Sequence, residues 1–268
     1  MSKEAFPVDA YLERIDYSGP LTATEDVLEA IQRAQLGHIP FENFDILLGR
    51  GISLEPAVLF EKLIDSPRGG YCFELNGLLL MALRSVGFEV RELLARVHTS
   101  GQPTGRTHAL ILVTLDSRFW IADAGFGGPS LRAPVPFELD VCRTQDGESF
   151  WLVDAGPFGT MLQKQSEGEW RDLYSFDLAQ VCRADIAVGN HFTSTSPLSH
   201  FTHTPVAALH GLTGKTTLRD RALRRIENGV EAVLELPDGA AYIAALKTHF
   251  GIEIDASAEA LLTVSAPR

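Results

Sequence analysis

The chain has 268 residues, of which 45% are hydrophobic and 22% charged, and its formal net charge at pH 7 is −12. This length predicts two domains, or three small ones, with ample core material. The acidic balance argues against nonspecific nucleic-acid binding, which needs basic residues to neutralise phosphates, but it allows a local basic pocket for a phosphorylated ligand.

Targeting and redox signals predict a cytoplasmic protein. Residues 1–7 lead straight into a mixed polar helix and lack the charged, apolar and small-residue succession of a signal peptide. The most apolar run, residues 75–83, is much shorter than the roughly 20 residues that span a bilayer. Three cysteines without close spacing do not suggest a disulfide framework. We therefore expect a reducing compartment and no membrane partner.

The first third of the chain, residues 8–88, has helical periodicity. One amphipathic segment includes Val27, Leu28 and Ile31. A second, around Leu59, has a proline near its start, where helices tolerate it. This part is expected to form a helical bundle.

Cys72 stands at the first turn of a further helix, predicted to run to about Ser85 and to be closed by Gly87. Two glycines precede it directly. At a helix N-terminus, unpaired N–H groups and the positive end of the helix dipole favour the thiolate, which is the nucleophilic form of cysteine. Cys142 and Cys182 lack such a position and are interpreted as ordinary small apolar residues.

Beyond residue 88 the pattern changes to strands, which is typical of a barrel or sandwich. The predicted strands are residues 90–97, 109–115, 119–122, 150–153, 160–165 and 170–176. Residues 128–147 are rich in proline and turn residues and are expected to be a long loop.

His108 and Asp123 flank two of these strands. The runs 109–113 and 119–122 predict an antiparallel pair, so both side chains are expected on one sheet. With the Cys72 helix packed against that sheet, the three residues would be the nucleophile, base and orienting acid of a catalytic triad. Each alone has a structural interpretation; together they indicate chemistry. His98 is the competing base, but it has no acidic partner motif.

The tail of the chain is predicted to be mixed. A short helical piece is expected at residues 177–183 and a helix over residues 238–250. Between residues 222–227 and 230–236, the Asn228-Gly229 pair predicts a hairpin. The tail histidines His200, His203 and His210 have no cysteine or carboxylate at ligand spacing, so no metal site is predicted.

At this point the sequence resembles a known family. Residues 68–76, Arg-Gly-Gly-Tyr-Cys-Phe-Glu-Leu-Asn, look like the signature of the arylamine N-acetyltransferases. Further family blocks follow in the right order: residues 38–45 (HIPFENFD), 106–108 (RTH), 123–127 (DAGFG) and 194–201 (STSPLSHF). The resemblance spans about residues 5–251. Ala124 and Phe44 replace the usual valine and leucine without touching the chemistry.

The resemblance implies an α+β fold in three parts with a cysteine-protease-like catalytic core. Residues 1–87 would be a helical bundle carrying the cysteine, residues 88–190 a β-barrel carrying the histidine and the aspartate, and residues 191–268 an α/β lid. Periodicity alone supports only an α+β enzyme.

The resemblance also implies an activity. Cys72, activated by His108 and Asp123, would attack acetyl-CoA, and the acetyl-cysteine would then be discharged by an arylamine, hydrazine or arylhydroxylamine nitrogen. Acetyl-CoA is thus the expected co-substrate, coenzyme A and a small amine are the expected partners, and no metal is expected.

Contact residues follow from the same resemblance. Phe41, Phe126 and Phe201 match positions of the acceptor pocket, although most phenylalanines simply pack in cores. Thr107 and the backbone at Gly125 and Gly127 are expected beside the pantetheine arm.

Two further features belong to the same blocks. The glycines of residues 125–128 lack the order and the following helix of a phosphate-binding motif. Arg68 is expected to pair with Glu42 and hold the cysteine loop.

Other function classes use the same triad. A cysteine hydrolase or a transglutaminase would need no coenzyme A, and a related amide synthase would close a macrolactam on a carrier-bound polyketide. A binding protein with an inactive triad is the remaining class. Acetylation of the cysteine by acetyl-CoA separates the first hypothesis from these.

Overall fold

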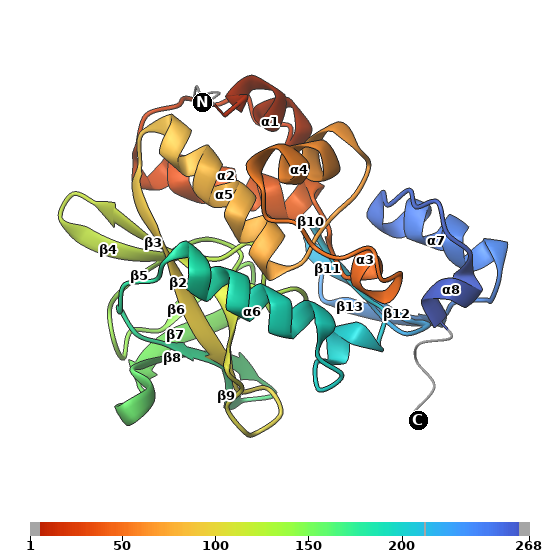
Figure 1. Cartoon of the computed structure of the whole chain (residues 1–268). Coiled ribbons are helices and arrows are strands. Elements are labelled where there is room, and N and C mark those ends of the chain that lie inside the picture. The colour runs from red at the N-terminus through yellow and green to blue at the C-terminus, as the bar shows by residue number, and fades with distance from the viewer. Residues whose placement is uncertain (1–5, 212, 263–268) are drawn as a thin grey trace.

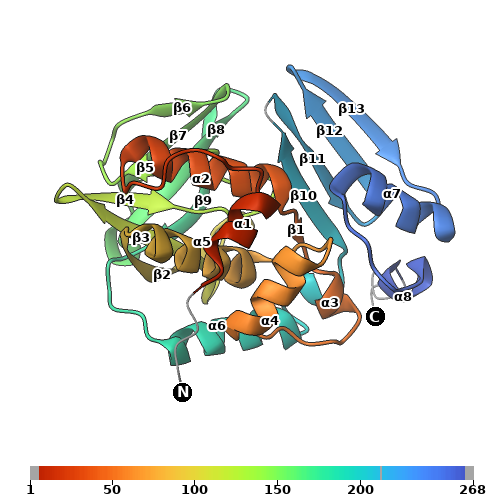
Figure 2. The same cartoon turned by 90° about the horizontal axis from the view of Figure 1, so that it is seen from above.

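The computed structural model describes residues 6–211 and 213–262. Helices from the N-terminal part lie between an eight-stranded, barrel-like sheet and a five-stranded sheet that carries the C-terminal helices (Figure 1, Figure 2). The expected α+β fold, with helices, a barrel and a C-terminal α/β lid, is confirmed.

The predicted N-terminal helices are present. They are α1 (Val8–Arg14), α2 (Glu25–His38), α3 (Phe44–Leu47), α4 (Pro56–Phe60), which continues into the π-helical turn η1 (Glu61–Asp65), and α5 (Cys72–Val86). Helix α2 begins where the Thr24 side chain accepts the Val27 N–H, and α4 has proline at its first turn. Gly87 ends α5 with a φ of 104°, in the left-handed region that glycine adopts freely.

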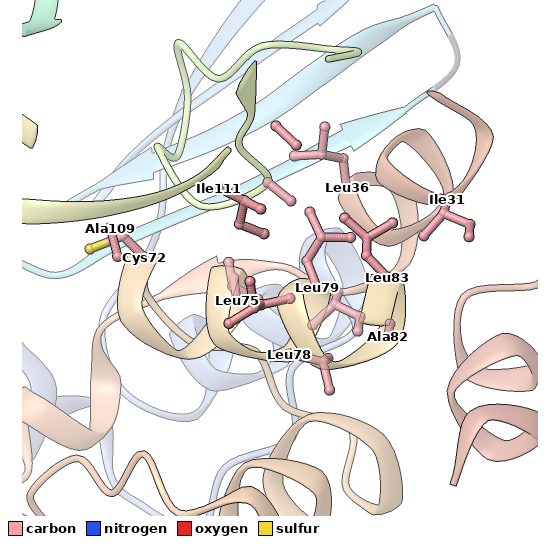
Figure 3. Close-up of a cluster of buried hydrophobic side chains, with 14 of the residues drawn as sticks. Ile31, Leu36, Cys72, Leu75, Leu78, Leu79, Ala82, Leu83, Ala109 and Ile111 are labelled. Carbon is pink, nitrogen blue, oxygen red and sulfur yellow. The ribbon is translucent and has the colours of Figure 1, made fainter. Parts of the chain in front are cut away.

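Helix α5 is the buried centre of the molecule. Its apolar residues, among them Leu75, Leu79 and Leu83, pack against Ile31 of α2 and Ile111 of the barrel (Figure 3). Each fully buried leucine contributes roughly 1.5–3 kcal/mol. Because the helix is held along its length, the position of its first residue is fixed.

The barrel-like sheet has the strand order β5-β4-β3-β2-β9-β8-β7-β6. Its strands are β2 (Glu89–Val97), β3 (Arg106–Leu115), β4 (Arg118–Ala122), β5 (Val135–Pro136), β6 (Arg143–Gln145), β7 (Glu148–Asp154), β8 (Thr160–Ser166) and β9 (Glu169–Phe176), with the short 3-10 helix η2 (Gly156–Phe158) after β7. All six predicted strands are confirmed, and β3 and β4 pair antiparallel as expected.

The lid sheet has the order β1-β10-β11-β12-β13, so a segment near residue 41 pairs with the C-terminal part. Its strands are β1 (Phe41–Glu42), β10 (Val206–Gly211), β11 (Gly214–Arg219), β12 (Ala222–Glu227) and β13 (Val230–Glu235). The C-terminal part also contains the 3-10 helix η3 (His200–Thr202) and the helices α7 (Ala240–Phe250) and α8 (Ala258–Leu262). The predicted hairpin is confirmed: Asn228 and Gly229 have φ values of 49° and 77°.

Two predictions on secondary structure are wrong, and two strands are not predicted at all. The helix expected at residues 177–183 instead is α6 (Arg183–Thr195), because the Asp185 carboxylate accepts the Cys182 N–H over 2.9 Å and caps the helix there. The loop expected at residues 128–147 contains the short strands β5 and β6. Strands β10 and β11 have no counterpart among the predicted strands.

Within residues 6–211 and 213–262, no helix combines the length and the apolar character that a membrane crossing requires.

Candidate active site

The structure brings Cys72, His108 and Asp123 together. Cys72 is the first residue of α5, His108 lies on β3, and Asp123 directly follows β4. His108 Nε2 donates to Asp123 Oδ2 over 2.7 Å, and the Cys72 thiol is a further hydrogen-bond partner of the same ring. The exposed fractions of the three residues are 3%, 1% and 0%. Sulfur, imidazole and carboxylate therefore form one buried chain of contacts.

Asp123 is held by several donors besides His108. Asn76 Nδ2 and the backbone N–H of Gly125 each donate to its Oδ1 over 2.9 Å, and the Asp123 N–H donates to Gln32 Oε1 over 3.0 Å. Burial acts to raise the pKa of Asp123, but the charge of His108 and the hydrogen bonds from His108, Asn76 and Gly125 to the carboxylate outweigh it and lower that pKa. The carboxylate is thus fixed in its ionised form.

The electrostatics of His108 favour the imidazolium. Burial acts to lower the pKa of His108, but the charge of Asp123, the hydrogen bond to it and the contact with Cys72 raise that pKa to about 10. At neutral pH the ring therefore carries a proton on each nitrogen, with a carboxylate on one side and sulfur on the other.

Aromatic side chains enclose the imidazole. The ring centroids of Phe126 and Tyr174 each lie 4.9 Å from that of His108 and 4.8 Å from one another. Tyr174 is fully buried; burial and the charge of Asp123 raise its pKa well above the usual range, so the phenol stays protonated. This packing fixes the ring orientation and keeps water away from the pair.

Of the predicted pocket residues, Phe126 therefore lies on the imidazole, and the other two lie together beside Tyr71. Phe41 and Phe201 have ring centroids 5.9 Å apart, and Phe201 contacts Tyr71, the residue before Cys72.

Of the predicted donor-contact residues, Thr107 and Gly125 lie against Cys72, and Gly127 lies against Phe41. The Thr107 carbonyl oxygen lies 3.9 Å from Cys72 Sγ, although the Thr107 hydroxyl faces Thr104. A Cβ added to Gly125 would lie 2.8 Å from the Cα of Cys72, so only glycine allows this approach. Gly127 has a φ of +80° and packs on the Phe41 ring.

Asn76, Gln32 and Tyr174 belong to the site but do not appear among the predicted site residues. Asn76 lies in the signature block, one turn of α5 after Cys72, so its spacing was a usable signal. Gln32 and Tyr174 come from elements far away in the sequence, and no local pattern marks them.

The expected pair between Arg68 and Glu42 is confirmed, with a distance of 2.7 Å, and it is part of a larger buried charge cluster. Lys62 Nζ lies 2.7 Å from Asp45 and 2.8 Å from Glu74. The other carboxylate oxygen of Glu74 accepts the backbone N–H of the residue before Cys72 over 3.0 Å. The cluster thus braces the start of α5 from the side opposite His108.

A cavity of about 590 Å³ adjoins this cluster and is lined by Asp45, Arg50 and Lys62 among others, but not by Cys72, His108 or Asp123. We place the candidate site at the sulfur because Cys72, His108 and Asp123 there supply a nucleophile, a base and an acid in contact. No three His, Cys, Asp or Glu side chains in residues 6–211 and 213–262 are grouped to hold a metal ion.

The sequence is similar to known N-acetyltransferases. A family model described as N-acetyltransferase matches residues 24–259. The arylamine N-acetyltransferase of Escherichia coli (strain K12) is 39% identical over 250 residues, which cover 91% of this chain and 88% of that protein. A Salmonella typhimurium relative, named arylamine N-acetyltransferase / N-hydroxyarylamine O-acetyltransferase, is 39% identical over 85% of this chain and 83% of its own.

Solved structures agree with the sequence matches. The arylamine N-acetyltransferase of Salmonella typhimurium superposes with a TM-score of 0.91 and 34% identity, covering 98% of this chain and 99% of that one. The Mycobacterium marinum arylamine N-acetyltransferase in complex with CoA gives a TM-score of 0.87 and 36% identity, covering 91% and 92%.

Proposed function

The chain belongs to the arylamine N-acetyltransferase family and is an acyltransferase; from this premise we propose that it moves an acetyl group from acetyl-CoA to an arylamine, hydrazine or arylhydroxylamine nitrogen through an acetyl-cysteine on Cys72. The CoA complex of the Mycobacterium marinum protein supports acetyl-CoA as the donor. The double name of the Salmonella relative supports arylhydroxylamines among the acceptors, with acetyl transfer to their oxygen in that protein.

One observation carries this proposal: the buried His108–Asp123 pair, 2.7 Å apart, with the Cys72 thiol on the same ring. In the first half-reaction His108 holds the thiol proton and the sulfur attacks the thioester carbonyl. The bond from the carbonyl carbon to the coenzyme A sulfur breaks, and His108 returns the proton to that sulfur. Backbone N–H groups at the start of α5 would stabilise the tetrahedral oxyanion.

In the second half-reaction the amine nitrogen attacks the acetyl-cysteine and passes its proton to His108, which restores the thiol. An arylamine is weakly basic and so is neutral and nucleophilic at pH 7. Phe41, Phe126 and Phe201 would offer it a flat apolar surface. The product is an amide or hydrazide, with double-displacement kinetics.

The donor would lie against the glycines. We propose that Thr107, Gly125 and Gly127 contact the pantetheine arm, because the first two lie against Cys72 and Gly127 lies against Phe41 in the same loop as Gly125. We also propose that the chain divides into three parts at residues 1–87, 88–190 and 191–268. The proposed location is the cytoplasm, and the proposed reaction needs no metal. A cysteine hydrolase, a transglutaminase or a macrolactam-forming amide synthase is not favoured by the family match.

Intact-mass measurement tests the proposal. Incubation with acetyl-CoA should add one acetyl group per chain, and an arylamine such as aniline should remove it faster than water does. The gain should disappear in Cys72→Ala and persist in Cys142→Ser and Cys182→Ser, whose cysteines are exposed and serve as matched controls. A chain that gains no acetyl group, or one that still gains it as Cys72→Ala, would refute the proposal.

A further inference from the structure

The loop of residues 125–128, here called the glycine loop, forms a wall beside the reactive sulfur. It begins two residues after Asp123, and its first residue packs on the Cα of Cys72. Phe126 rests on the His108 ring, and Gly127 lies on the Phe41 ring. The glycine loop therefore borders the catalytic cysteine and histidine.

The two ends of the glycine loop are held by different parts of the molecule. At its start, the Gly125 N–H donates to Asp123 Oδ1, and the next backbone N–H upstream, of Ala124, donates to Asn76 Oδ1 over 3.0 Å. These bonds belong to the active site itself.

At its end the loop is held from the lid. His210 on β10 donates from Nε2 to the Gly127 carbonyl over 2.9 Å, and Lys215 on β11 donates from Nζ to the Gly128 carbonyl over 3.0 Å. The two residues are cross-strand partners and so project from the same face of the lid sheet. Figure 2 shows β10 and β11 as the lid strands nearest to the barrel.

The contacts of His210 suit a fixed donor. The side chain is 3% exposed, and burial together with the charge of Arg132 lowers the pKa of His210 to about 3. The neutral ring carries its proton on Nε2, because that atom faces a carbonyl. A neutral donor of this kind keeps its bond to Gly127 across the physiological pH range.

Lys215 ties the same loop to the barrel. Its ammonium lies 2.7 Å from Glu148 on β7, and Lys164 on β8 lies 2.6 Å from the same carboxylate oxygen. The lysine thus connects three elements: the lid strand β11, the glycine loop and the barrel wall.

We propose that His210 and Lys215 are positioning residues that hold the glycine loop in the shape that receives the acyl donor. This inference rests on the proposed function. Because the start of the loop is tied to Asp123 and Asn76, loss of the lid bonds changes the shape of the loop end and leaves the thiol, imidazole and carboxylate in place. Donor affinity should therefore depend on the lid, and thiol reactivity should not.

The variants His210→Met and Lys215→Met test this, with His210→Gln as the conservative variant that keeps a donor. Lys247→Met is the matched control, since Lys247 is a lid lysine that is 65% exposed and pairs with Glu253. Two quantities are compared: the KM for acetyl-CoA, and the rate of Cys72 alkylation by iodoacetamide, a small reagent that does not use the donor site.

We expect the KM for acetyl-CoA to rise about 5- to 50-fold in both methionine variants, the usual range for loss of a hydrogen bond that leaves a carbonyl unpaired. Alkylation should stay within about twofold of the parent protein, His210→Gln should recover part of the loss, and Lys247→Met should behave as the parent. Circular dichroism checks folding. If His210→Met does not fold, Lys215→Met carries the test, because its side chain is 16% exposed and methionine keeps the stem.

The outcomes separate the two hypotheses. An unchanged KM in a parent protein that is acetylated on Cys72 would overturn the positioning role and leave the proposed function standing. A slowing of alkylation by as large a factor as the rise in the KM for acetyl-CoA would also overturn it, since the lid would then support the triad. A parent protein that acetyl-CoA does not acetylate would remove the proposed function itself.

Discussion

The start of α5 lies between two buried groups of charged residues that behave differently. On one side, the charge cluster pairs Lys62 with Asp45 and Glu74, and Arg68 with Glu42 and Asp45. On the other side, His108 uses one ring nitrogen for Asp123 and presents the ring to Cys72.

The two groups differ in whether a proton can be transferred near pH 7. In the cluster every cation is shared between carboxylates; burial acts to lower the pKa of Lys62, but the charges of Glu74, Glu42 and Asp45 raise it. Such a group holds a backbone and has no proton to transfer near pH 7. In the site, one partner of the imidazole is a thiol, which can exchange its proton and form a covalent bond. Similar burial and pairing thus support a scaffold on one side and chemistry on the other.

The largest expected effect is on the reactive side. His108→Ala should lower the rate of acetyl transfer by about 10²–10⁴-fold, the usual effect of losing a positioned base. Steady-state rates with acetyl-CoA and an arylamine measure this, with circular dichroism as the folding check. His98→Ala is the matched control, since His98 bonds Ser175 and not the site. A near-normal rate in His108→Ala, or an equal loss in His98→Ala, would contradict the assignment.

Removing the central cation of the cluster should affect stability instead. Lys62→Met removes the cation that pairs with buried Glu74 and one of the cations that pair with Asp45, which keeps Arg68, and should lower the free energy of unfolding by about 3–5 kcal/mol. Urea unfolding measures the loss, and Lys247→Met should change stability by no more than about 0.5 kcal/mol. If folded Lys62→Met is as inactive as His108→Ala, the cluster takes part in the chemistry and the distinction fails.

Local patterns explain what could be predicted of these two regions. Helix α5 and strands β3 and β4 combine apolar periodicity with a capping residue or a turn, so the sequence predicts the elements on or beside which Cys72, His108 and Asp123 lie. Of the cluster, only the pair between Glu42 and Arg68 was expected, and it came from the family blocks.

The missing parts depend on contacts between distant segments. Gln32 meets the backbone of Asp123 across 91 residues, which no local signal shows. Strand β11 mixes polar residues with glycine and is stabilised by its neighbours β10 and β12. Because the sequence pattern does not predict β10, it gives no sign that His210 hydrogen-bonds the glycine loop.

A smaller effect concerns pH. The pKa of His108 is raised in the folded chain to about 10, against about 6.5 when unfolded, so the folded state binds this proton more tightly. The resulting stabilisation is complete below pH ~6.5 and is lost as pH rises toward ~10, on the order of a few kcal/mol. Asp123→Asn removes the carboxylate charge that raises this pKa and should flatten the profile. Urea unfolding between these pH values measures both proteins, and parallel profiles would argue against the pairing.

The same variant has a chemical readout. Asparagine leaves the imidazole without its orienting charge, so iodoacetamide should alkylate Cys72 more slowly at pH 6 in Asp123→Asn than in the parent protein, by about tenfold or more. Unchanged alkylation there would remove Asp123 from the triad.

The smallest expected effect is the change that salt makes to the stability contributed by buried and by exposed ion pairs. The Debye length falls from about 10 Å at 0.1 M salt to about 3 Å at 1 M, which weakens exposed pairs much more than buried ones. The stability difference between the parent and Lys62→Met should therefore change by less than about 0.5 kcal/mol between these conditions. Arg33→Met disrupts the pair with Asp146, whose side chains are 34% and 30% exposed, and its smaller effect should shrink in salt. If the Lys62→Met difference shrinks in the same proportion, water and ions reach the cluster, and it cannot brace the start of α5 as a closed network.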